Sequence, residues 1–229
     1  MGQINELLSK YDVLGAFWVT IKLTLLSALF ALILGTVVAV MRVCPISVLR
    51  RTGAAYVTVL RNTPLTLIIV FCNLGLFVTL GLKLADAQSH TFIADNNFRL
   101  AVLGLSVYHA SFVAEAIRSG INTVPTGQAE AARSIGLGFM QTLRFVVLPQ
   151  AFRGAIAPLG NTFIALTKNT TVAVAIGVPE VSYLMRGMIE FNSSLLFFIF
   201  LLLSFGFVVL TLPVGVAFTG LSRRLAVRR

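Results

Sequence analysis

Residues Glu130–Pro149 read EAARSIGLGFMQTLRFVVLP and interrupt a very apolar chain. They open with Glu130-Ala131-Ala132-Arg133, place Gly136 four residues after Ala132, and close on Leu148-Pro149. The stretch carries Glu130, Arg133 and Arg144, in a chain that is 57% hydrophobic and only 11% charged. A long polar loop between apolar runs costs loop entropy, so its presence indicates a function.

The apolar runs around this loop predict membrane-spanning helices. A soluble domain carries about 25% charged residues, and a bilayer core needs about 20 apolar residues per helix. The runs are Leu23–Met41, Leu65–Leu82, Leu100–Ala114, Ala155–Pro179 with one charge at Lys168, and Phe191–Ser222. We therefore expect an all-α membrane protein with five spans, at about 19–41, 56–82, 98–118, 155–180 and 193–221. A packed soluble core is the alternative, and the low charge content disfavours it.

Residues 1–229 form a single membrane domain in this interpretation. Residues 1–18 are predicted to be an amphipathic helix, because apolar residues recur there at helical spacing. That helix either lies in the outer interface, with Trp18 near the headgroups, or packs against the neighbouring spans. Residues 119–154 form the long loop, in which a helix is expected from about Gln128 to Ser134.

Basic residues gather in every second segment between the predicted spans. Three such segments hold twelve of the 18 Lys and Arg residues but two of the eight acids. The twelve are Arg42, Arg50, Arg51, Arg61, Arg118, Arg133, Arg144, Arg153, Arg223, Arg224, Arg228 and Arg229. Because cytoplasmic loops are rich in Lys and Arg, we expect a multi-pass plasma-membrane protein with the N-terminus outside and the C-terminus cytoplasmic. This topology explains the net charge of +10, so no nucleic-acid partner is expected.

The sequence contains none of the common nucleotide-binding or hydrolase motifs. It contains no GxxxxGK[ST] loop, HExxH or GxSxG, so we expect no enzyme activity and no bound nucleotide on this chain. Cys44 and Cys72 are far apart and form no CxxC, and His90 and His109 have no partner cluster. We therefore expect no metal site and no catalytic residue.

A polar cluster lies in the fourth predicted span, at Lys168, Asn169, Thr170 and Thr171. An ionisable residue at membrane depth is costly and usually faces a cavity or a partner. The Lys168 ammonium and the nearby donors suit the carboxylate of an amino acid substrate. Alternatively, Lys168 pairs with a buried acid such as Glu115 or stabilises a helix break.

Two further groups of polar residues lie in or beside the predicted spans. Asn62 and Thr63 precede Pro64 at the entrance of span two, where a helix break either exposes backbone amides or forms a plain turn. Ser111 and Glu115 share one face of span three. Glu115 either holds a substrate ammonium or has a structural role at the start of the long loop, and we favour the structural role.

The spacing of Glu130-Ala131-Ala132, Gly136 and Leu148-Pro149 resembles the EAA loop of ABC importer permeases, with Val146 where that family usually has Ile. Longer stretches resemble the permeases of polar amino acid importers, of the His, Gln and Glu type. They are LRNTPLTLIIVF, NNFRLAVLG, FVAEAIRSGINTVPTGQAEAARSIGLGF and GNTFIALTKNTTVAVAIGVPE. LTKNTT and NNFRLAVLG are most similar to the glutamate permeases of actinobacteria.

The resemblance implies the type I importer permease fold and a set of partners. The loop would couple the chain to cytoplasmic ATP-binding subunits, through Glu130, Ala131, Ala132, Arg133, Gly136, Leu148 and Pro149. ATP and Mg would bind those subunits, so no cofactor is expected on this chain. A homologous or identical permease would pair with it, and an external substrate-binding protein would deliver the amino acid, expected to be L-glutamate.

The resemblance also places substrate near spans two to four, which favours the cluster at Lys168–Thr171. Lys168-Asn169 stands where many relatives carry Lys-Asp, so the contact chemistry there differs. A channel or scaffold subunit that needs no ATPase is the alternative function. Co-purification of a nucleotide-binding subunit separates the two.

Overall fold

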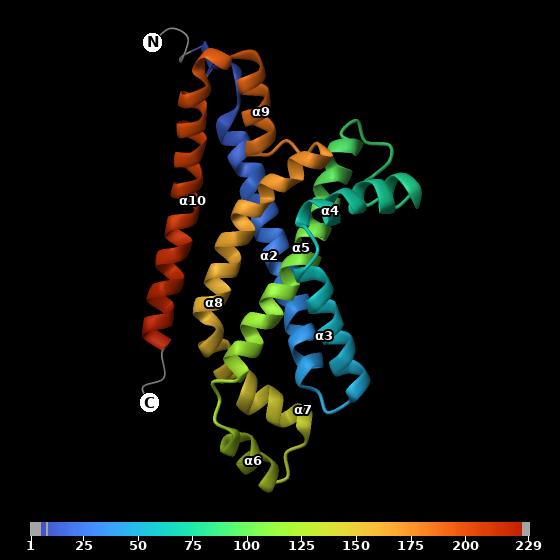
Figure 1. The fold of residues 1–229 in the computed structure, drawn as a ribbon, viewed down its shortest axis with the longest axis vertical. Coiled ribbons are helices and arrows are strands. Elements are labelled where there is room, and N and C mark those ends of the chain that lie inside the picture. Colours follow the sequence, from blue (N-terminus) through green and yellow to red (C-terminus); the bar gives the residue numbers. More distant parts are fainter. Residues whose placement is uncertain (1–5, 8, 226–229) are drawn as a thin grey trace.

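The computed structural model describes residues 6, 7 and 9–225, and this part of the chain contains helices but no strands (Figure 1). The predicted all-α class is confirmed. In chain order the elements are α2 (Val13–Val43), α3 (Ser47–Arg61), α4 (Leu65–Val70), the π-helix η1 (Phe71–Thr79), α5 (Phe92–Ile121), α6 (Thr126–Ser134), α7 (Phe139–Thr142), the π-helix η2 (Leu143–Val147), α8 (Leu148–Asn169), the 3-10 helix η3 (Thr170–Ile176), α9 (Val181–Phe191), the 3-10 turn η4 (Ser193–Leu195) and α10 (Leu196–Leu225).

Three helical segments of the described chain are each long and apolar enough to cross a bilayer: α2, α5 and η4–α10. Two bent pairs reach that length and composition only together. Residues 47–61 and 65–79 meet at 103°, and residues 139–176 and 181–191 meet at 58°. By length and composition, the described chain therefore has three candidate spans, or up to five if each bent pair counts as one.

The long helices run between two ends of an elongated molecule (Figure 1). The start of α2, α9 and the start of α10 lie at one end. The start of α3, the end of α10 and the segment α6–α7–η2 lie toward the other. We call residues 126–147, which comprise this last segment, the hook.

Helix α5 is the centre of the fold, although its uncharged run is the shortest of the five. In its most apolar 18 residues, 72% are buried, against 33% in α2 and 11% in η4–α10. It packs against both α2 and α8. Because neighbouring helices shield it from lipid, α5 can carry polar residues at modest cost. The buried ones are Asn96, Asn97, Ser106, His109 and Ser111.

The predicted break before Pro64 is present, and it lies farther from the hook end, along α5, than expected. Helix α3 ends at Arg61, and the Tyr56 hydroxyl donates to the Val107 carbonyl halfway along α5, at 2.6 Å. At about 1.5 Å per residue, the 15 residues of α3 place its end about 22 Å from its start. The break therefore lies beside the middle of α5, with Asn62 and Pro64 exposed, and Arg61 is not at the hook end.

The N-terminal segment differs from a single helix over residues 1–18. Asp12 ends the first helical turn and caps α2, because its carboxylate accepts from the Gly15 backbone N–H at 2.8 Å. Leu14 and Trp18 therefore belong to α2, and both are exposed. Leu7 is buried in a cluster with residues of α9 and α10, which supports a packing role for it. Residues 1–5 and 8 lie outside the described part of the chain.

A close crossing between α5 and α8 depends on Gly120. A Cβ atom built on Gly120 would lie 2.1 Å from the Ala151 backbone oxygen, so any side chain forces the helices apart. Nearby, a Cβ on Gly154 would lie 2.6 Å from the Thr123 hydroxyl oxygen. Small residues on both helices therefore set their separation just before the hook.

We predict that Gly120→Val destabilises the protein by about 1–3 kcal/mol, because overpacking at a helix crossing displaces backbone. Thermal unfolding of the purified protein, followed by circular dichroism, measures the change. Gly220→Val in α10 is the matched control, since no atom lies within 4 Å of a Cβ built there. Equal unfolding temperatures for the two variants would contradict the proposed role of the crossing.

Candidate coupling hook and pathway residues

The hook begins with α6, which ends in a specific turn at Gly136. The Gly136 N–H donates to the Arg133 carbonyl at 2.9 Å, and the Leu137 N–H donates to the Ala132 carbonyl at 3.2 Å. This pair of bonds is the Schellman motif, which needs a left-handed residue after the helix. Gly136 supplies it with a φ of 90°, and no atom lies within 4 Å of a Cβ built there. Gly136 is therefore required for the turn, and within the described chain no other backbone lies close to it.

The EAA residues divide between the surface and the interior of the hook. Glu130, Ala131 and Arg133 are exposed, whereas Ala132 is buried where α6 lies against η2. The underside of the hook is formed by Thr142, Leu143 and Val147, all buried. Leu148 is half-buried and Pro149 exposed, and both lie in the first turn of α8. The outer face of α6 is thus available to a partner.

Three large apolar side chains are exposed on the hook, and sequence reasoning did not single them out. Ile135 is 80% exposed, Met140 61% and Phe145 62%. The Arg144 guanidinium lies over the Phe145 ring, 5.6 Å from its centroid. Exposed apolar groups with a charged rim are typical of protein interaction sites. Their sequence signal is the presence of large apolar residues in a loop between the predicted spans.

The hook is continuous with α8. The π-helix η2 passes into α8 at Leu148 with no break in the helical backbone. Gln150, in the first turn of α8, donates to the Gln128 side chain of α6 and to the Val146 carbonyl. The hook and the start of α8 are therefore joined by continuous helical backbone and by side-chain hydrogen bonds.

At the other end of α8 lies the cluster proposed for substrate. The Thr170 hydroxyl donates to the Thr167 carbonyl at 2.8 Å, and the Thr171 hydroxyl to the Lys168 carbonyl at 2.7 Å. Both hydroxyls are therefore engaged in ending the helix. The Lys168 side chain is exposed. Asn169 reaches across to α5, where its side-chain nitrogen lies 3.2 Å from Nε2 of His109.

His109 is thus the one histidine that meets a candidate residue, although the sequence showed no partner for it. Its ring is buried and also lies against the rings of Tyr108 and Phe112. The sequence places His109 and Asn169 sixty residues apart, so only the packing of α5 on α8 brings them together.

The remaining candidate residues have local structural partners. Glu115 pairs with Arg42 of α2 and with Arg118 one turn along α5. It therefore pairs with these arginines rather than with Lys168. The buried Ser111 hydroxyl donates to the Tyr108 carbonyl at 2.7 Å. These contacts agree with the structural role favoured for Glu115.

Asn62 and Thr63 lie at the break after α3 and satisfy its last carbonyls. Their side chains donate to the Thr58 and Val59 carbonyls, at 2.7 and 2.8 Å. Beyond the break, α4 packs against η3, the turn that follows Lys168. The two interrupted helices therefore meet in one apolar cluster, whose shared residues include Leu65, Ile69, Ala173 and Ile176.

Residues 31–227 match the family described as the binding-protein-dependent transport system inner membrane component. The chain belongs to this family. It is therefore a multi-pass membrane subunit of a transport system, and the solved relatives below are chains of ABC transporters.

Curated relatives extend over nearly the whole chain. The glutamate transport system permease protein GluC of Corynebacterium glutamicum is 57% identical over 218 residues, which are 95% of this chain and 96% of that protein. GluC of Corynebacterium efficiens is 56% identical with the same coverage. The probable glutamine ABC transporter permease protein GlnM of Bacillus subtilis is 34% identical over 88% of this chain and 89% of its own length.

Solved structures support the fold. A chain in the crystal structure of an amino acid ABC transporter with histidines superposes with a TM-score of 0.78 at 26% identity, covering 98% of this chain and 96% of that one. A chain of the inward-facing MetNI methionine ABC transporter superposes with a TM-score of 0.73 at 23% identity, covering 94% and 96%. The ABC importer permease fold expected from the sequence is therefore present.

We predict that the ion pair between Arg42 and Glu115 ties α2 to α5 with a coupling energy of about 0.5–3 kcal/mol. The Arg42 side chain is only 14% exposed, so Glu115→Gln leaves a poorly solvated charge without its partner. A thermal-unfolding double-mutant cycle with Arg42→Gln measures the coupling. Glu190→Gln, which removes an exposed acid on α9, is the control. If the effects of Glu115→Gln and Arg42→Gln on stability simply add in the double variant, the prediction is wrong.

Proposed function

We propose that this chain is the permease subunit of an ATP-driven importer of L-glutamate. The observation that carries the proposal is the 57% identity with a glutamate permease over nearly the full length of both chains. Matches to glutamine permeases reach only 33–34% identity. The pathway cluster at Lys168–Asn169 is compatible with a substrate that bears a side-chain carboxylate.

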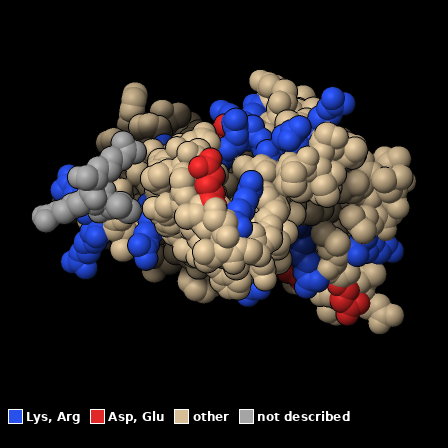
Figure 2. All heavy atoms as spheres, turned by 90° about the horizontal axis from the view of Figure 1, so that it is seen from below, with Lys and Arg blue, Asp and Glu red and all other residues tan. Residues whose placement is uncertain are grey.

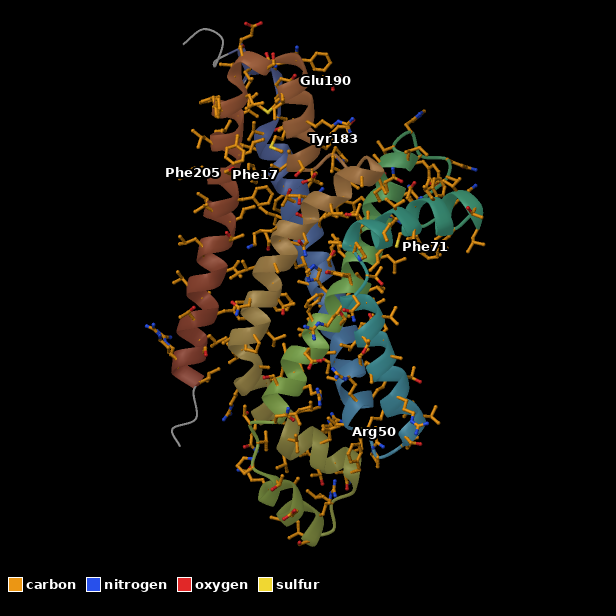
Figure 3. All side chains as sticks on the ribbon, in the orientation of Figure 1. Phe17, Arg50, Phe71, Tyr183, Glu190 and Phe205 are labelled. Atoms are coloured by element: carbon orange, nitrogen blue, oxygen red, sulfur yellow. The ribbon has the colours of Figure 1, made fainter. Side chains whose placement is uncertain are left out.

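The proposed orientation has five spans, an external N-terminus and a cytoplasmic C-terminus. Basic side chains gather at the hook end, where Figure 2 shows many Lys and Arg and few Asp and Glu. Arg50, near the start of α3, lies at this end, and Glu190 lies at the opposite one (Figure 3). An excess of Lys and Arg marks the cytoplasmic side. The two bent pairs each count as one span in this proposal.

The hook is proposed to bind a cytoplasmic ATPase subunit, which carries ATP and Mg. Glu130, Ala131 and Arg133 form the outer face of α6, and Ile135, Met140 and Phe145 supply apolar anchors beside it. Buried Ala132 packs α6 against η2, and the turn at Gly136 ends α6, so together they fix the position of that face. Leu148 and Pro149 begin α8 and so connect the hook to the pathway.

Motion of the hook is proposed to reach the pathway through α8. The 22 residues of α8 span about 33 Å between the hook and Lys168. Pro158 removes one backbone donor within α8, but the helix continues through it. The close crossing at Gly120 makes α5 follow α8, so His109 and Asn169 move together.

The substrate is proposed to pass along a face that a second permease, identical or homologous, completes. Lys168 is exposed on the single chain, so its ammonium is available to a cavity between two subunits. Asn169 is held toward α5 by His109. Thr170, Thr171, Asn62 and Thr63 shape the helix ends around this face, because their side chains bond to nearby carbonyls. Ser111 lies within α5, where its hydroxyl donates to the Tyr108 carbonyl. An external substrate-binding protein is the proposed donor of the amino acid.

We predict that Glu130→Trp reduces glutamate uptake at least tenfold and abolishes co-purification of the ATPase, because a bulky ring blocks the outer face of α6. Uptake of labelled glutamate by cells, normalised to the amount of permease in the membrane, measures the effect. Gln88→Trp, in the exposed loop at the other end, is the control. Normal uptake by the Glu130 variant would refute the coupling role, and normal uptake without any ATPase partner would favour a channel.

We predict that Lys168→Met lowers glutamate uptake about tenfold while leaving ATPase co-purification intact, because the substrate carboxylate loses its cation. Lys168→Arg should retain part of the activity, since the charge is kept. Lys83→Met, an exposed lysine outside the pathway, is the control. An unchanged KM and maximal rate for Lys168→Met would remove Lys168 from the substrate site.

A further inference from the structure

A groove between α2 and α5 lies away from the hook and the pathway cluster. Its volume is about 590 Å³. Its lining residues include Leu26, Phe30, Ile33 and Val37 of α2 and Phe98 and Arg99 of α5. The lining is almost entirely apolar, and four of its α2 residues are more than 40% exposed. The groove is therefore an open surface that no other part of the described chain covers.

The length of the groove matches one leaflet of a bilayer. Leu26 and Val37 are eleven residues apart on one helix, which is about 17 Å. Half of a 30 Å hydrocarbon core is about 15 Å. An acyl chain of ordinary length can therefore lie along the groove from end to end.

Two cations flank one end of the groove. Lys22 is one turn before Leu26 on α2, and its ammonium lies 5.8 Å from the centroid of the Phe98 ring, a groove residue of α5. Arg99 lines the groove itself and uses one N–H to donate to the Leu84 carbonyl. Both side chains are exposed, and neither forms an ion pair within the described residues. The opposite end, around Val37, carries no charged lining residue.

Along one face of α2, the residue types change in the same order as the headgroup, phosphate and acyl chain of a phospholipid. Trp18, Lys22, Leu26, Phe30, Ile33 and Val37 recur every three or four residues, so they share one face of the helix. Trp is favoured at the headgroup level, a cation suits the phosphate, and the apolar residues suit the acyl chain. A groove that binds a second protein chain would not need aromatic and cationic residues at one end and only apolar residues at the other.

We propose that this groove is a binding site for an anionic phospholipid, with its phosphate between Lys22 and Arg99 and an acyl chain along α2. The site is independent of the amino acid carried and of the hook. It recognises a net negative headgroup, so phosphatidylglycerol binds better than phosphatidylcholine with the same chains.

Trp18 provides a direct test, because it is the one tryptophan in the chain and lies one turn before Lys22. The full-length protein is reconstituted in equimolar phosphatidylglycerol and phosphatidylcholine, with brominated acyl chains on one lipid at a time. Bromine quenches tryptophan fluorescence at short range. Brominated phosphatidylglycerol should quench Trp18 more than brominated phosphatidylcholine, and the preference should fall about fivefold for each cation removed.

The decisive variant is K22Q/R99Q, for which both lipids should quench equally. K10Q/R186Q removes the same charge from exposed residues outside the groove and should keep the preference. Ile33→Gln should weaken quenching by both lipids, whereas Leu29→Gln, exposed on α2 but outside the groove, should not. Equal quenching in the unmodified protein, or a preference that persists in K22Q/R99Q, overturns the proposal. Absence of quenching by either lipid means that protein covers the groove, which also overturns it.

Discussion

A helix in lipid must satisfy its own backbone hydrogen bonds, and the rest of this structure depends on that constraint. The chain departs from regular α-helix in both bent pairs. Helix α3 ends at Arg61, and α8 passes after Asn169 into the 3-10 helix η3, which ends at Ile176 before the 58° bend. Both places pack against other helices. At each place, hydroxyl or amide side chains donate to carbonyls near the end of the α-helix. Asn62 and Thr63 bond to carbonyls of α3, and Thr171 bonds to the carbonyl of Lys168. Both places lie beside residues proposed for the pathway, and irregular backbone at membrane depth is tolerated where it is packed against protein or lines a cavity.

The sequence predicted the features that depend on local chemistry. The helix expected near Gln128–Ser134 is α6, Gly136 ends it, and the break before Pro64 is present. Backbone preference and the missing proline donor act within a few residues, so these signals need no knowledge of the fold. The bulk apolar runs likewise predicted membrane helices, since length and hydropathy are properties of each segment alone.

The features that the sequence left open depend on neighbours. An uncharged run cannot show that α3 meets the next helix at 103°, or that Arg61 lies beside Phe112 of α5, because both follow from packing on α2 and α5. The run in α5 was the shortest, yet α5 is the most buried of the long helices. Burial by other helices replaces the need for a long apolar stretch. The contact between His109 and Asn169 was invisible for the same reason.

The distribution of contacts also indicates which parts of the chain can move relative to one another. Near the hook end, Arg42 and Glu115 join α2 to α5, and the crossing at Gly120 joins α5 to α8. At the other end, Asn97 of α5 accepts from Asn73 of η1 and donates to the Ile176 carbonyl of η3, at 2.8 and 2.7 Å. Hydrogen bonds of this kind can exchange partners, whereas a backbone contact as close as that at Gly120 cannot slide. We therefore expect α5 and α8 to move as one body with the hook, and the rearrangement to occur where α4, η1 and η3 meet α5.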